Sequence, residues 1–124
     1  MAIGYASAPE GHPTATRIAG PGGLLFLSGV APRPGEAGVP SAAARQAELV
    51  CDELDRMLAA SSIGWASVAK VLLYLTDIRD EAEVRAVLAA RYGADWVPAF
   101  TTVQVDNLQH PGSRVQLDVI AASA

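Results

Sequence analysis

The last quarter of the chain reads PAFTTVQV at residues 98–105 and, after a turn, RVQLDVIA at residues 114–121. Both segments alternate with a period of two, which is typical of a half-buried strand because successive side chains leave opposite faces of the pleat. In the second segment, alternate positions from residue 115 to residue 121 are apolar and predict a face covered by helices. The positions between them place polar side chains on the opposite face: Arg114, Gln116 and Asp118.

The first segment combines an aromatic residue with polar ones. Phe100, Thr102 and Gln104 share one face of the predicted strand. Polar groups beside a Phe predict either a solvated surface or a site that something else closes. We expect a crevice beside Phe100 and Gln116.

The preceding chain alternates strands with helices. A short extended piece at residues 14–19, a glycine-rich turn at residues 20–23 and an apolar run at residues 24–27 predict two strands. The nearly continuous apolar run at residues 68–75 predicts a central strand that is covered on both sides.

Two amphipathic helices separate these strands. The first is predicted to run for about five turns from Ser41, because apolar residues recur at three- and four-residue steps. They are Ala43, Ala47, Val50, Leu54, Met57 and Leu58. The second is predicted to begin at Asp80, which forms a capping box with Glu83, and to end at Gly93. The order of elements predicts an α+β fold, one mixed sheet with two helices on one face.

Length and charge limit the function classes. The 124 residues are predicted to form one domain, residues 1–124. The net charge is −4 and the nine Lys and Arg residues are scattered, which argues against nucleic acid or a membrane surface as a partner. No apolar run spans a bilayer, and no signal-peptide pattern opens the chain. The lone Cys51 suits a reducing compartment, so a cytoplasmic location is expected.

An apolar central strand leaves one face of the sheet in need of cover, because two helices shield one side only. We therefore expect a homo-oligomer whose sheets meet on that face, with sites between subunits. We expect neither a metal nor a cofactor. His12 and His110 lie in separate segments without the ligand spacing of a zinc site, and the turn at residues 20–23 lacks the Lys of a phosphate-binding loop.

Five segments, in order along the chain, resemble the RidA family, also called YjgF or L-PSP. They are LFLSG at residues 25–29, the helix beginning near Ser41, VAK at 68–70 followed by YLTD at 74–77, the Pro-Ala pair at 98–99, and VQLDVIA at 115–121. The resemblance implies a chorismate mutase-like fold and a homotrimer that holds a small-molecule ligand in a cleft between subunits. It also implies hydrolysis of reactive imines and enamines, such as 2-aminoacrylate, to a keto acid and ammonia.

Four positions depart from the site of that family. Where active deaminases have an Arg that clamps the substrate carboxylate, this chain has Phe100, which cannot form a two-point ion pair. The acidic residue that positions the attacking water corresponds to Gln116. The family's Cys corresponds to Thr102, and the Tyr of its N-terminal loop corresponds to Pro13.

Other residues are candidates to replace the missing groups. Arg85 corresponds to a family position, usually Asn, near the cleft, and is either a relocated cation or a solvated surface charge. Arg114 is a second candidate cation or a strand-end ion pair, and His12 suits general acid–base chemistry near neutral pH. Ser28 and Gly29 keep the family pattern. The candidate catalytic residues are thus Gln116, Thr102 and His12, and the candidate binding residues are Phe100, Arg85, Ser28, Gly29 and Arg114.

Three functions are compatible with these residues. The first is an enzyme that acts on a small imine, enamine or carbonyl metabolite, with hydrolytic deamination as the reaction. The second is a trimer that binds a small metabolite, or regulates a partner, without turnover. The third is a specialised biosynthetic enzyme on the same scaffold.

Overall fold

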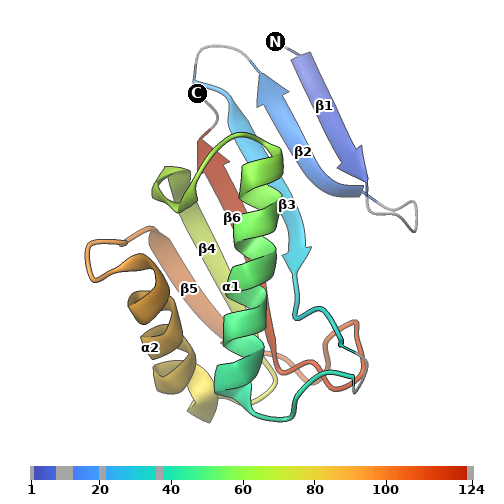
Figure 1. Cartoon of the computed structure of the whole chain (residues 1–124), viewed down its shortest axis with the longest axis vertical. Helices are drawn as coiled ribbons and strands as arrows, with labels where there is room; N and C mark the ends of the chain where they lie inside the picture. Colours follow the sequence, from blue (N-terminus) through green and yellow to red (C-terminus); the bar gives the residue numbers. More distant parts are fainter. Residues whose placement is uncertain (1, 8–12, 20–21, 36–37, 123–124) are drawn as a thin grey trace.

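The described residues form six strands and two α-helices (Figure 1). The computed structural model describes residues 2–7, 13–19, 22–35 and 38–122, the first two ranges as backbone only. The strands are β1 (Ala2–Ser7), β2 (Pro13–Ala19), β3 (Leu24–Val30), β4 (Val68–Leu75), β5 (Ala99–Gln104) and β6 (Val115–Ala122). The helices are α1 (Ala43–Ala60) and α2 (Glu81–Tyr92), with short 3-10 turns η1 (Trp65–Ser67) and η2 (Ile78–Asp80).

The strands form one mixed sheet in the order β1-β2-β3-β6-β4-β5. Neighbouring strands are antiparallel except β4 and β5, which run parallel. The last strand, β6, therefore lies inside the sheet between β3 and β4, and β5 forms an edge. The two segments around the final turn are both strands, as predicted, but they are not neighbours because β4 lies between them.

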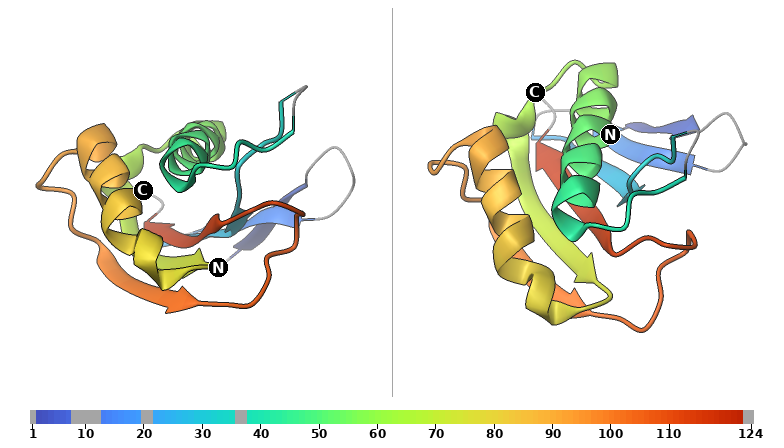
Figure 2. Two further views of the ribbon diagram at one scale, coloured as in Figure 1. Left: turned by 90° about the horizontal axis from the view of Figure 1, so that it is seen from below. Right: turned by 60° about the horizontal axis from the view of Figure 1, so that its bottom comes forward.

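Both helices pack on one side of the sheet, so the predicted α+β architecture is confirmed (Figure 2). α1 contacts β3 and β6. Its predicted apolar stripe is buried throughout: Ala43, Ala47, Val50, Leu54, Met57 and Leu58. Beneath the helices, the buried strand residues include Val71, Leu73, Leu75, Val115, Leu117, Val119 and Ala121. None of the described helices is long and apolar enough to cross a membrane.

Cys51 belongs to this core. Its side chain is buried, and burial raises the pKa of the thiol to about 11 even though Arg91 and Tyr92 act to lower it. Thiol reactivity requires the thiolate, so Cys51 is a packing residue at neutral pH.

The N-terminal strand β1 was not predicted. It pairs with β2 from Ala2 opposite Ala19 to Ser7 opposite Pro13. The predicted turn at residues 20–23 lies partly outside the described residues. Gly22 has a φ of 72°, which favours glycine, and β2 and β3 are antiparallel neighbours, so the chain reverses there.

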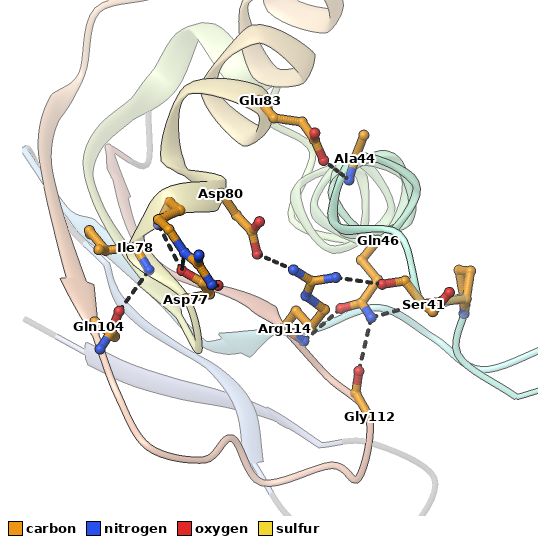
Figure 3. Close-up of polar contacts among 12 residues, drawn as sticks. Ser41, Ala44, Gln46, Asp77, Ile78, Asp80, Glu83, Gln104, Gly112 and Arg114 are labelled. Atoms are coloured by element: carbon orange, nitrogen blue, oxygen red, sulfur yellow. Dashed lines mark hydrogen bonds and ion pairs between the residues drawn. The ribbon is translucent and has the colours of Figure 1, made fainter.

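Helix α1 begins without a cap of its own. Its N-cap residue is Ala42, which has no side-chain acceptor, and the helix starts at Ala43 rather than near Ser41. The carboxylate of Glu83 in α2 accepts the hydrogen bond instead, 2.9 Å from the backbone nitrogen of Ala44 (Figure 3). Because the first N–H groups of a helix have no partner within it, α2 completes the start of α1.

The predicted capping box at the start of α2 is wrong. Asp80 is the N-cap residue, but its side chain makes no cap hydrogen bond. Its carboxylate pairs instead with the guanidinium of Arg114, 2.7 Å from Nη2, while the carboxylate of Glu83 is bonded to α1. Both side chains join separate elements, and neither caps its own helix.

The side of the sheet without helices carries a patch of apolar side chains. The half-buried members are Phe26, Leu72, Tyr74, Val103 and Ile120, and the exposed member is Leu24 at 38%. Within β4, half-buried Leu72 and Tyr74 alternate with fully buried residues. The central strand is therefore fully covered on the helix side only.

Gln46 joins three segments at the lower end of the fold (Figure 3). The side chain is buried, and its amide nitrogen donates to the carbonyl oxygens of Pro40 and Gly112 at 2.7 and 2.9 Å. Its amide oxygen accepts from the backbone N–H of Arg114 at 2.7 Å. One amide thus ties the entry to α1, the loop before β6 and the start of β6.

We predict that Gln46→Ala lowers the free energy of unfolding by about 2–4 kcal/mol, because buried backbone groups lose their partners. Urea unfolding followed by circular dichroism measures the change. Gln109→Ala, at an exposed position, is the control and is expected to change stability by less than about 0.5 kcal/mol. Equal stability of the two variants would show that the Gln46 contacts contribute nothing.

Candidate functional site

A β-bulge interrupts the pairing of β3 with β6. Residues 27 and 30 of β3 pair with residues 119 and 117 of β6, so Ser28 and Gly29 stand opposite the single residue Asp118. Both Ser28 and Gly29 are exposed. A bulge leaves backbone groups unpaired and re-aims a side chain, which is why bulges often border functional sites.

The side-chain amide of Gln116 lies across this bulge. A Cβ atom at position 29 would come within 2.3 Å of Gln116 Nε2 and 2.9 Å of its Cδ, so glycine is required for the amide to lie there. Gln116 is half-buried and alternates with the buried residues of β6, so it projects away from the helices. Ser28, Gly29 and Gln116 form one polar group, which we call the bulge group.

Phe100 and Thr102 project to the other side of the sheet. They pair with Val71 and Leu73 of β4, which are both buried beneath the helices. Directly paired residues of neighbouring strands project to the same side. Phe100 is half-buried and packs against the core.

Arg85 of α2 lies directly over these strand residues. Its guanidinium carbon is 4.1 Å from the centroid of the Phe100 ring, within the range of a cation–π contact. Nη2 donates to the Thr102 hydroxyl at 3.1 Å, and Nε donates to Glu81 at 3.2 Å. Arg85, Phe100, Thr102 and Glu81 form a second group, which we call the edge group because β5 is an edge strand.

The edge group also lowers the pKa of a carboxyl group. Hydrogen bonding by the Thr102 hydroxyl, with a further contribution from Arg85, lowers the pKa of Glu81. Glu81 therefore stays ionised and partly neutralises Arg85. Sequence reasoning missed Glu81, although its position four residues before Arg85 is the usual spacing of an ion pair on a helix.

A single chain does not bring Phe100 and Gln116 together, so the expected crevice beside them stays a prediction about a site between copies. Phe100 faces the helices, and Gln116 faces the opposite side of the sheet. The period-two pleat separates them, because Phe100 is paired with Val71 whereas Gln116 is paired with Tyr74, three residues further along β4. The two groups face one another only if different copies of the chain contribute them.

Arg114 does not share a face with Gln116. Its guanidinium turns to the start of the two helices, where it bonds the carbonyl oxygen of Ser41 at 2.9 Å and Asp80 at 2.7 Å (Figure 3). A second ion pair between an arginine and an aspartate lies nearby. Arg79 holds the pKa of the Asp77 carboxyl at about 2 through hydrogen bonds. Of the two interpretations of Arg114, the geometry favours the strand-end ion pair.

The remaining candidates contribute no described contact. His12 lies outside the described residues, and β2 is described as backbone only at Pro13. Across the part of the chain that the structure describes, His, Cys, Asp and Glu residues form no group of three that could hold a metal ion.

The two groups offer different chemistry. The bulge group supplies a hydroxyl and a neutral amide, which bind polar ligands by hydrogen bonds, and an amide takes up no proton. The edge group supplies a cation on an aromatic surface. The carboxylate of the edge group, Glu81, lies on the helix side of the sheet. On the Gln116 side, the exposed Asp118 lies two residues along β6, opposite the bulge, while position 116 itself carries a neutral amide.

We predict that Gly29→Ala and Gln116→Ala are coupled. The new methyl group displaces the Gln116 amide, so truncating Gln116 removes part of the destabilisation that Gly29→Ala causes. The effects of the two changes on the free energy of unfolding are therefore expected to differ from additivity by about 0.5 kcal/mol or more. Urea unfolding of the single and double variants measures this. Gly64→Ala, where a Cβ meets nothing within 4 Å, is the matched control, and additive effects at positions 29 and 116 would contradict the contact.

Comparison with known proteins supports the resemblance that the sequence suggests. A family model described as endoribonuclease L-PSP matches residues 7–123. Protein DfrA of Myxococcus xanthus is 42% identical over 78 residues, which are 63% of this chain and 58% of that protein's own length. The mitochondrial protein mmf2 of Schizosaccharomyces pombe is 32% identical over 103 residues, covering 82% of this chain and 81% of its own.

The solved structures agree with this result. A crystal structure of a YjgF-family member from Neisseria meningitidis has 33% sequence identity and a TM-score of 0.82, and the match covers 100% of this chain and 97% of that one. The yeast protein YEO7 has 30% identity and a TM-score of 0.81, with 97% and 93% covered. The chain therefore belongs to the L-PSP family, also called YjgF or RidA.

Proposed function

We propose that copies of this chain assemble as a homotrimer and that each site between copies takes a small imine, enamine or carbonyl metabolite. One observation carries the proposal. Ser28, Gly29 and the Gln116 amide converge at a bulge on the side of the sheet that has no helices, beside apolar residues that need cover. Membership of the L-PSP family supports the same arrangement.

The separation of the two groups supports assembly. A site that needs both must join the bulge group of one copy to the edge group of another. These are different surfaces, and contacts between unlike surfaces of identical chains form a ring where the rotation between copies closes. β5 is an edge strand, so it is accessible to a neighbouring copy.

The apolar patch offers the driving force for assembly. Leu24, Phe26, Leu72, Tyr74 and Ile120 come from three adjacent strands, β3, β6 and β4. Apolar side chains gathered on one face in this way favour an interface, and the charged Lys70 and Asp118 share that face. Covering it would also complete the burial of β4, which the helices provide on one side only.

Hydrolysis is the reaction that the family resemblance implies for such a ligand. An enamine first tautomerises to the imine. Water then adds to the carbon of the C=N bond, so a C–O bond forms and one water proton passes to the nitrogen. The C–N bond breaks as the remaining hydroxyl proton is transferred to the nitrogen, which leaves a C=O group and ammonia. In the proposed site the Gln116 carbonyl oxygen accepts a hydrogen bond from the water, while Ser28 and Gly29 bind an oxygen of the ligand. No proton passes to Gln116, so catalysis by this chain is expected to be weak.

Gln116 also favours a second candidate function, binding without turnover. A neutral amide orients a ligand as well as a carboxylate does, yet it offers no base. Replacing the amide by a carboxylate of the same shape therefore separates a binding protein from a weak hydrolase.

We predict that the purified protein has the mass of three chains by size-exclusion chromatography with light scattering. Ile120→Glu places a charge within the apolar patch and is expected to shift the mass towards one chain. Val97→Glu makes the same type of change at a residue that is 81% exposed and is expected to leave the mass unchanged. If the wild-type protein is a monomer at micromolar concentrations, the proposed site between copies is wrong.

We predict that Gln116→Glu increases the hydrolysis of 2-aminoacrylate about tenfold or more, because a general base contributes about that much at least. The enamine is generated from serine by a dehydratase and tautomerises to the imine, and its decay is followed by semicarbazide trapping. Gln109→Glu adds the same charge at an exposed position and is the control. If both wild type and Gln116→Glu leave the decay at the buffer rate, the deaminase reaction is excluded.

A further inference from the structure

Arg85 contacts three neighbours while part of its guanidinium stays free. A guanidinium has five N–H donors in a planar fork. In Arg85, Nε donates to Glu81 and one N–H of Nη2 donates to Thr102, which leaves three donors on Nη1 and Nη2. The guanidinium carbon lies over the Phe100 ring, 4.1 Å from its centroid.

This arrangement differs from that of Arg114 and Arg91, which also link elements. Arg114 bonds a backbone carbonyl and a carboxylate, and Arg91 bonds the carboxylates of Asp52 and Asp55. Both therefore have their terminal nitrogens engaged. Arg85 meets one carboxylate, through Nε, and its side chain is 44% exposed. The end of its fork remains available to a ligand.

The guanidinium lies between one apolar surface, the Phe100 ring, and two polar groups, Glu81 and Thr102, that it already bonds. The Thr102 hydroxyl is engaged by both Arg85 and Glu81, so it has no role left as a donor to a ligand. The half-buried Phe100 ring is the other surface next to the guanidinium. A ligand that reaches Arg85 therefore meets carbon beside its charged group.

We infer that Arg85 is the anion-binding residue of the site and that it selects a carboxylate carried on an apolar or aromatic group. The inference rests on the proposed function, because it assigns a role within that same site. A carboxylate matches the fork through two parallel hydrogen bonds. Phe100 keeps the fork in place and provides the apolar surface for the rest of the ligand.

The inference also explains why Phe100 and Arg85 belong together. An Arg at position 100 would put a second guanidinium where the ring now contacts the first, and like charges at this separation repel. A cation on β5 and a cation at position 85 of α2 are therefore alternatives. This chain has the second arrangement, with an aromatic residue beneath it.

The binding of two probes, one charged and one neutral, tests the assignment. Isothermal titration calorimetry measures the affinity of the wild-type protein for 3-phenylpropionate and for its amide, 3-phenylpropionamide. Arg85→Gln is expected to weaken binding of the carboxylate tenfold or more and to leave binding of the amide within twofold. Arg85→Lys keeps the charge without the fork and is expected to lie between wild type and Arg85→Gln.

Arg45→Gln is the matched control. Arg45 is an exposed helical arginine paired with Glu48, so its replacement removes the same charge and a similar ion pair. It is expected to change the affinity for 3-phenylpropionate by less than twofold. Circular dichroism of each variant confirms that the fold is retained.

The outcomes separate the inference from the proposed function. If 3-phenylpropionate binds wild type and Arg85→Gln equally well, Arg85 is not the anion contact, although a ligand site exists. If acetate binds as tightly as 3-phenylpropionate, the selection for an apolar group is wrong. If neither probe binds the trimer at millimolar concentration, both the inference and the binding site between copies are overturned.

Discussion

The pleat of the sheet decides where each candidate residue lies. Side chains of β5 and β6 alternate between the helix side and the open side, and β4 fixes the register of both strands. Phe100 and Thr102 must then face the helices when Gln116 faces away from them. A one-residue slip in either strand would move its whole apolar set to the wrong side, so the core and the site depend on the same register.

The second constraint is polar and lies where the two helices begin. Gln46, Glu83, Asp80 and Arg114 bond across elements, and Glu83 of α2 completes the start of α1 (Figure 3). This network uses Arg114 as a structural tie. The contrast with Arg85, which keeps part of its fork free, shows why exposure and partners together distinguish a ligand contact from a fold contact.

Periodic features of the fold could be predicted from the sequence. The alternation at residues 115–121 and the stripe of α1 each depend on side chains near one another in the chain, and both were correct. Strand order was not accessible, because insertion of β4 between β5 and β6 depends on pairing between distant segments. The capping box failed for the same reason, since Asp80 found a distant partner in Arg114 that local spacing does not reveal. In the site, Arg85 was identified as a candidate, but its contact with Phe100 arises only when α2 packs on β5.

The interior position of β6 has a consequence for how the chain is made. β3 ends at Val30 and β4 begins at Val68, and their common neighbour β6 is synthesised after the other five described strands. Until β6 is made, the β1–β3 meander and the portion with the two helices, β4 and β5 are joined by the backbone but not by strand pairing. Synthesis must therefore pass β6 before the sheet closes into one body, and a chain that stops earlier leaves β3 and β4 with exposed edges.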